Sequence, residues 1–224
     1  MLTAFFAVSA FAQSQNNEMS IEASYLQQTL ENMIIRESAR ADTRDTKLIA
    51  LEYIDKAIEN GNTSTEVKQA LEYLSMEGRR SVARENGRVV NNFPDVRRQA
   101  AKQLGKFGGE EAKDVLIQIC QVENEPMVLQ EAIKSLGDIG INNNNETIAS
   151  ICWVVRKFDN LNPDNLMAIA TIDAFEKIAK ANGGLNSPEA IQLLVRISEG
   201  YYVTPVRERA RQLMAELRTY GSGN

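Results

Sequence analysis

Apolar residues recur every three or four positions through most of this 224-residue chain, and that spacing predicts α-helices. In the segment that begins at Pro94, the residues Val96, Ala100, Leu104 and Phe107 form one apolar stripe on such a helix. Alternation with a period of two is not found over any length, so no β-strand is predicted. The hydrophobic pattern therefore predicts an all-α protein.

The predicted helix at 94–108 has a copy 32 residues later, at 126–140. The two stretches, PDVRRQAAKQLGKFG and PMVLQEAIKSLGDIG, align without a gap and share Pro, Val, Ala, Lys, Leu and both Gly. Proline suits the first turn of a helix, and glycine readily adopts the left-handed conformation that ends one. Weaker copies lie at 165–179 and 205–217, and a looser one lies upstream near residue 50. The chain is therefore built from repeats.

Second helices are predicted between these copies, at 111–121, 147–158 and 188–198. A two-helix unit of this size cannot bury its apolar faces alone, so successive units must stack. The prediction is an α-solenoid, a superhelix of stacked antiparallel helix pairs. Its expected parts are a linker and capping helix with a polar outer face at 13–43, divergent helical repeats at 44–93, clear repeats at 94–219 and a flexible tail at 220–224.

The pattern Pro-x-Val-Arg, followed by Ala and then Leu-Gly-x-Phe-Gly, resembles the HEAT repeat, especially the short HEAT-like form first associated with phycobilisome lyases. The resemblance covers residues 94–218. It implies that the Val-Arg helices line the concave side of the solenoid and the second helices its convex side. Arg97 and Arg207 match the family's arginine, whereas Leu129 and Ala168 replace it in the middle copies.

The first residues are typical of an export signal. Leu2 to Ala12 is apolar and uncharged, it ends in Ala-Phe-Ala, and polar residues follow from Gln13. This pattern predicts a signal peptide at 1–12, cleavage before Gln13 and a periplasmic or extracytoplasmic protein. The run is much shorter than the ~20 residues of a membrane-spanning helix, so no span is expected in the mature chain. No Lys or Arg precedes the run, which leaves a buried or frayed N-terminal helix as the alternative.

Histidine is absent from the sequence. Since histidine is the commonest acid–base residue near neutral pH, its absence excludes Ser-His-Asp triads, Cys-His pairs and His-ligated zinc sites. No Gly-rich phosphate loop or metal-ligand motif occurs either, so we expect no catalytic residue, no cofactor and no metal. The net charge of −5 argues against nucleic acid as a partner.

A basic segment at 79–106 holds eight Lys or Arg residues and two acidic ones. One interpretation is a patch that binds an acidic partner; the other is a solvated face whose arginines pair with neighbouring acids. Aligned on the repeat, Arg98, Lys102 and Lys134 occupy positions that, as the resemblance to HEAT repeats implies, line the concave groove. Together with Arg97, they are the candidate protein-binding residues.

Two further pairs are candidates. Tyr201 and Tyr202 precede the last repeat helix and could anchor a partner, or one of them could pack beneath the loop. Cys120 and Cys152 lie in consecutive second helices and could form a disulfide in an oxidising compartment, or be two separate buried thiols. Trp153 is expected in the core.

These features favour a non-catalytic protein-binding scaffold of the periplasm or cell envelope that uses the concave face of the solenoid. The alternative is a structural subunit of a larger envelope or appendage assembly. An enzyme similar to the lyases that carry HEAT-like repeats is the third hypothesis.

Overall fold

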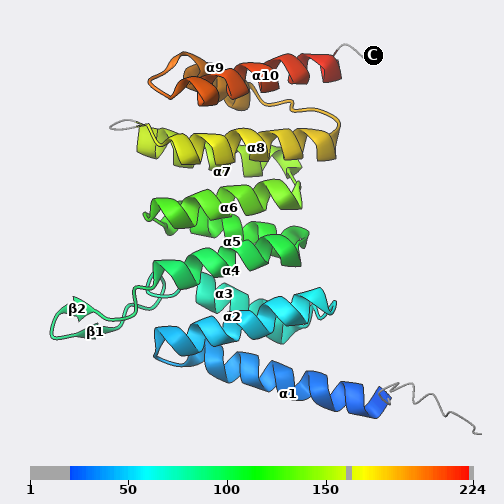
Figure 1. Ribbon diagram of the computed structural model, residues 1–224, viewed down its shortest axis with the longest axis vertical. Helices are drawn as coiled ribbons and strands as arrows, with labels where there is room; N and C mark the ends of the chain where they lie inside the picture. The colour runs from blue at the N-terminus through cyan, green and yellow to red at the C-terminus, as the bar shows by residue number, and fades with distance from the viewer. Residues whose placement is uncertain (1–20, 160–162, 222–224) are drawn as a thin grey trace, which may run out of the picture.

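A computed structural model describes residues 21–159 and 163–221, which form a column of ten α-helices (Figure 1). The helices stack in file, from α1 at one end to α9 and α10 at the other, and do not wrap around a shared centre. The predicted all-α solenoid is confirmed. The helices are α1 (Ile21–Arg40), α2 (Arg44–Glu59), α3 (Thr65–Ser75), α4 (Pro94–Phe107), α5 (Gly109–Val122), α6 (Pro126–Ile139), α7 (Glu146–Asp159), α8 (Asn165–Asn182), α9 (Pro188–Glu199) and α10 (Thr204–Gly221).

The helices form two layers. In the first layer α2, α4, α6, α8 and α10 each pack against the next, and in the second layer α3, α5, α7 and α9 do the same. The repeat helices found in the sequence are the first layer, and the helices predicted between them are the second. Each repeat is therefore one helix from each layer.

The residues shared by the repeats have the roles expected of them. Pro94 and Pro126 stand in the first turn of α4 and α6, where a missing N–H costs no hydrogen bond. Gly140 ends α6 in the left-handed conformation, with φ 73°. Gly108 also has positive φ, 72°, but its ψ of −174° turns the chain directly into α5.

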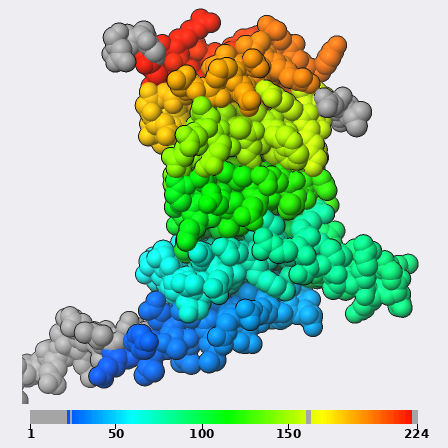
Figure 2. Space-filling model, turned by 180° about the vertical axis from the view of Figure 1, so that it is seen from behind, coloured from blue at the N-terminus to red at the C-terminus, as the bar shows by residue number. Residues whose placement is uncertain are grey.

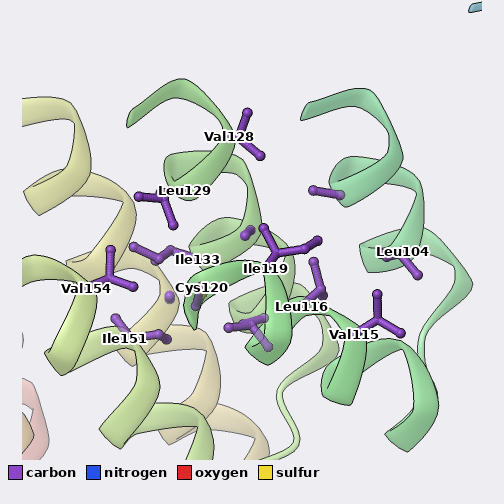
Figure 3. Close-up of a cluster of buried hydrophobic side chains, with 14 of the residues drawn as sticks. Leu104, Val115, Leu116, Ile119, Cys120, Val128, Leu129, Ile133, Ile151 and Val154 are labelled. Carbon is purple, nitrogen blue, oxygen red and sulfur yellow. The ribbon is translucent and has the colours of Figure 1, made fainter. Parts of the chain in front are cut away.

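One continuous apolar core runs through the stack, with members from Ile35 in α1 to Leu213 in α10. In Figure 3, Leu104 of α4, Leu116 of α5, Val128 of α6 and Ile151 of α7 contribute to a single cluster. All four side chains are fully buried. Each helix pair therefore buries its stripe against the neighbouring pairs, as the repeat pattern predicts.

Two glycines inside first-layer helices allow close approach. A Cβ atom added at Gly137 in α6 would lie 2.6 Å from the Cα atom of Ala174 in α8. One added at Gly105 in α4 would lie 2.8 Å from the Cβ atom of Ser135 in α6. Both glycines come from the shared Leu-Gly dipeptide, so this dipeptide sets the spacing of the layer.

The expectation that no strand occurs is wrong. Strands β1 (Arg84–Glu85) and β2 (Arg88–Val89) form an antiparallel hairpin that projects from the side of the stack (Figures 1 and 2). Its turn is Asn86-Gly87, both with positive φ, which is the typical sequence of a two-residue hairpin loop. Strands of two residues are too short for alternation to reveal them, and the Asn-Gly dipeptide was the available signal.

The first helix covers the end of the stack, where it packs against α2 and α3. The expectation that its outer face is polar is wrong, because Leu26, Leu30 and Met33 are 63%, 60% and 52% exposed. The predicted signal peptide lies outside the described residues, as does the tail beyond residue 221. Among the helices described, none combines the length and the hydrophobicity that a membrane crossing needs.

Candidate functional site

A shallow groove of about 370 Å³ lies on the first layer between α4 and α6. Three of the predicted binding residues line it: Arg98 and Lys102 from α4 and Lys134 from α6. Met127, which is 39% exposed, adds an apolar surface, and Glu131 completes this side of the groove. We refer to it below as the α4–α6 groove.

The charges of the α4–α6 groove do not cancel. Arg98 Nε lies 3.3 Å from Glu131 Oε2, and the other acid of the groove, Asp95, is paired with Arg44 of α2 at 2.5 Å. Lys102 and Lys134 are exposed, and neither has an acidic partner within residues 21–159 and 163–221. The groove therefore offers two unpaired ammonium groups.

Elsewhere on the first layer, acid–base pairs join neighbouring helices. Lys106 of α4 lies 2.6 Å from a carboxylate oxygen of Asp55 in α2, and Lys177 of α8 lies 2.5 Å from one of Asp138 in α6. Arg209 of α10 pairs with a glutamate of α8. Lys56 of α2 also has no acidic partner in the described part of the chain, so what distinguishes the α4–α6 groove is that two such lysines, from adjacent helices, line one hollow.

The prediction that Arg97 belongs to the binding surface is wrong, because its side chain is 0% exposed. Arg97 Nε donates to Glu123 Oε2 at 2.5 Å. Its Nη1 donates to the carbonyl of Glu77 and to Asn92 Oδ1, each at 3.0 Å. Arg97 follows Val96 on the flank of α4 that faces the loop after α5, so it joins this loop to the segment that precedes α4.

Glu123 is the acid at the centre of this buried cluster. It also pairs with Arg79, and its Oε1 accepts the backbone N–H groups of Asn124 and Glu125 at 2.8 and 3.0 Å. Burial raises the pKa of Glu123, but the hydrogen bonds from Arg97 and the two amides lower it further than burial raises it. The carboxylate is therefore charged and held in place.

The remaining cations of the basic segment mostly have partners. Arg79 pairs with Glu123, Arg80 donates to Gln118 at 3.2 Å, and Lys106 binds Asp55. Arg84 and Arg88 are exposed on the hairpin. Outside the α4–α6 groove, Arg79, Arg97 and Lys106 therefore pair with acids as the second interpretation expects, whereas Arg80, Arg84 and Arg88 have no acidic partner among the described residues.

The two adjacent tyrosines have different environments. Tyr201 is 98% exposed, whereas Tyr202 is 5% exposed and its hydroxyl donates to Asp159 Oδ1 at 2.6 Å. Burial and this carboxylate raise the pKa of Tyr202. Only Tyr201 is open to a partner, and it lies in the loop between α9 and α10, away from the α4–α6 groove.

Cys120 and Cys152 are both free and buried, so the possible disulfide is not formed in the structure. Burial raises the pKa of each thiol to about 12, which makes both poor nucleophiles. Trp153 is 47% exposed, and the expectation that it lies in the core is wrong. It lies on the outer side of α7, where Lys157 Nζ is 5.1 Å from its ring centre.

Three exposed carboxylates gather on the second layer, those of Glu110, Asp114 and Glu146. Lys113 Nζ lies 2.6 Å from Glu110 and 3.2 Å from Asp114, and it also pairs with Glu146. Burial lowers the pKa of Lys113, but hydrogen bonds to the three carboxylates raise it by more, so the ammonium stays charged. This ammonium already supplies the cation that such a cluster would bind.

Comparison with known protein families supports the assignment of the stacked helix pairs as repeats. A family model for HEAT repeats matches residues 88–152, which include all of α4, α5 and α6 and the first half of α7. This stretch contains the α4–α6 groove. No curated protein shows a detectable similarity to the chain.

Proposed function

We propose that this HEAT-repeat protein is a non-catalytic scaffold that binds another protein on its first layer, with an acidic segment of the partner in the α4–α6 groove. The observation that carries the proposal is the pair of unpaired lysines, Lys102 and Lys134, beside the exposed side chain of Met127. Cations beside an apolar side chain favour a peptide that carries both acidic and apolar residues. By resemblance to HEAT repeats, we expect this layer to be the concave side.

A catalytic role is disfavoured by the residues available. The sequence has no histidine, and both thiols are buried with raised pKa values. The carboxylates Glu110, Asp114 and Glu146 are committed to Lys113. A lyase-like enzyme would need another acid or base, and the two carboxylates of the groove, Glu131 and Asp95, are already paired with Arg98 and Arg44.

For the compartment, we propose the periplasm or another extracytoplasmic site. The support is the apolar run from Leu2 to Ala12 with small residues before Gln13. N-terminal sequencing of the protein from its native cells tests this directly. A first residue of Gln13 is the expected result, and a chain that retains Leu2–Ala12 would refute export by cleavage.

The binding proposal is tested by crosslinking in the native compartment and identification of what is captured. The test variant carries Lys102→Glu and Lys134→Glu, which reverses the charge of the groove. The matched control is Lys56→Glu in α2, an exposed lysine without an acidic partner in the described part of the chain. The partner should be lost with the test variant and retained with the control.

Two results would contradict the proposal. Equal capture by the two variants would show that the α4–α6 groove is not where the partner binds. Capture of no protein by the unchanged chain, together with turnover of a small molecule, would favour the enzymatic hypothesis. Added salt should weaken capture of the partner by the unchanged chain, because the groove lysines are exposed and their charges are screened.

The alternative, a structural subunit of a larger envelope assembly, is favoured by the apolar outer face of α1. Exposed apolar patches of this kind mark interaction sites.

A further inference from the structure

A second hollow, of about 410 Å³, lies beside the start of α8. Much of its wall is apolar, because Pro126 of α6, Phe158 of α7 and Leu166 of α8 line it. Leu166 is 69% exposed, so most of its apolar surface meets water rather than the rest of the fold. We refer to it below as the α6–α8 hollow.

The α6–α8 hollow adjoins the α4–α6 groove. Pro126 lines the hollow, and Met127, the next residue of α6, lines the groove. The helices α4, α6 and α8 run in the same direction, so their first residues lie along one edge of the stack (Figure 1). A chain that leaves the groove over the start of α6 therefore reaches the hollow.

The hollow and the groove differ in charge. The groove has the unpaired ammonium groups of Lys102 and Lys134, whereas the charged residue that lines the hollow is an acid, Asp164. Its carboxylate already accepts two backbone N–H groups from the first turn of α8 and the side-chain amide of Gln130. An acidic residue would be repelled from the hollow, whereas an apolar one would take the surface of Leu166 out of water.

On the basis of the function proposed above, we propose that the acidic segment of the partner continues, in extended conformation, from the α4–α6 groove over the start of α6 and places a large apolar side chain in the α6–α8 hollow. The partner is then recognised by two residues. An Asp or Glu is held between the two groove lysines, and a Leu, Met or Phe packs on Leu166 and Phe158.

The positions of the two sites give the spacing of these two residues. Met127 and Lys134 are seven residues apart on α6, which is about 10 Å along the helix axis. Packed helices lie about 8–10 Å apart, so the acid and the apolar residue are separated by about 13 Å. An extended chain covers this distance in about four residues, and residues four apart point to the same side of it. The expected motif is therefore an acid and a large apolar residue about four positions apart.

Site-specific photocrosslinking of the full chain in its native cells tests the path of the partner. A photoreactive phenylalanine analogue replaces Met127 in the groove or Leu166 in the hollow. The matched control has it at Ile191, an exposed apolar residue of α9 in the second layer. We expect the same protein to be crosslinked from Met127 and from Leu166, and not from Ile191.

Mass spectrometry of the crosslinked peptides tests the spacing. The two crosslinks should fall within one short stretch of the partner that holds an Asp or Glu and a large apolar residue about four positions apart. Crosslinks in two separate parts of the partner would overturn the proposal, because one extended segment would then not fill both sites.

The outcomes separate this proposal from the proposed function. Crosslinking from Met127 but not from Leu166 would overturn the path through the α6–α8 hollow and leave the partner in the groove. Crosslinking of a second copy of this chain from Leu166 would also overturn it. Crosslinking of no protein from either position would contradict the proposed function itself.

A substitution tests the apolar contact. Leu166→Gln should raise the dissociation constant of the captured partner, once purified, by about tenfold, and Ile191→Gln should leave it unchanged. Both side chains are exposed, so neither change should disturb the fold, which circular dichroism checks. Equal affinity for Leu166→Gln and the unchanged chain would overturn the contact.

Discussion

The buried arginine of α4 is the sharpest test of how this stack is held together. Arg97→Met removes the guanidinium and keeps most of the side-chain volume. Glu123 would keep Arg79 and the amide N–H groups of the next two residues. The Glu77 carbonyl and the Asn92 side chain would each lose a donor.

The expected cost follows from these groups. Removal of one partner from a buried ion pair costs about 3–5 kcal/mol, because the other charge stays buried without it. Since Arg79 remains on Glu123, the lower part of this range, about 3 kcal/mol, is expected. A typical domain is stable by only about 5–15 kcal/mol, so the loss is readily measured.

The assay is urea unfolding followed by circular dichroism, with Arg98→Met as the matched control. Arg98 is the next residue of the same helix, and its side chain is 52% exposed, so its pair with Glu131 should contribute less than about 1 kcal/mol. Equal destabilisation by the two variants would refute the reasoning. So would a loss below about 1 kcal/mol for Arg97→Met.

The same cluster makes a prediction about pH. The pKa of Glu123 is lower in the folded protein than its ordinary value of about 4.3. A lowered carboxyl pKa stabilises the fold fully above the unfolded pKa, and this contribution is lost as pH falls through the folded pKa. As the pH falls from 7 into the acid range, the free energy of unfolding should therefore decrease less for Arg97→Met than for the unchanged chain. A parallel acid profile for the two proteins would contradict this.

Three further outcomes are expected. Gly137→Ala should destabilise by about 1–3 kcal/mol in thermal unfolding, because its Cβ would force α6 and α8 apart, although alanine favours helix; a stabilised variant would refute the close contact. Tyr202→Phe should cost about 1 kcal/mol, since its hydroxyl binds a buried carboxylate; no change in the unfolding midpoint would contradict this. Cys120 and Cys152 should resist a thiol reagent in the folded protein and both react after denaturation without reductant, whereas two unreactive thiols in the denatured chain would indicate a disulfide.

The repeat units could be predicted from sequence because several signals agree there. Pro94 and Pro126 mark helix starts, Gly140 marks an end, and the stripe between them has the helical period. Every unit buries the same stripe against the next, so one local pattern determines the long-range packing as well. The close approach at Gly105 and Gly137 is the physical reason for the shared Leu-Gly dipeptide.

The candidate site could be predicted only in part. The alignment of the repeats predicted that Arg98, Lys102 and Lys134 lie in one groove, because equal positions in adjacent repeats lie side by side, and the structure places all three there. It could not show that Arg97 is buried, since its acceptor Glu123 lies 26 residues away in a loop that carries no repeat signal. The hairpin was missed because two-residue strands have no measurable period.

The expectation that the outer face of α1 is polar was also wrong, and the cause applies to helices in general. Ile35 is buried while Leu26, Leu30 and Met33 are exposed, so α1 is apolar on more than one side, and spacing alone does not show which side meets the stack. The rule that terminal units have polar outer faces led to the wrong expectation, because here the outer side of α1 carries Leu26, Leu30 and Met33.

The proposed partner would also account for the two free lysines of the α4–α6 groove. Lys102 and Lys134 stand at the same position of adjacent repeats, and packed helices lie about 8–10 Å apart, so the two ammonium groups repel each other weakly. The fold supplies an acid to Lys106 and to Lys177 on the same layer, which shows that pairing is available to it there. In the groove the acids Asp95 and Glu131 are already taken by Arg44 and Arg98. A carboxylate from another chain would relieve the repulsion, whereas no acid of this chain's described residues is placed to do so.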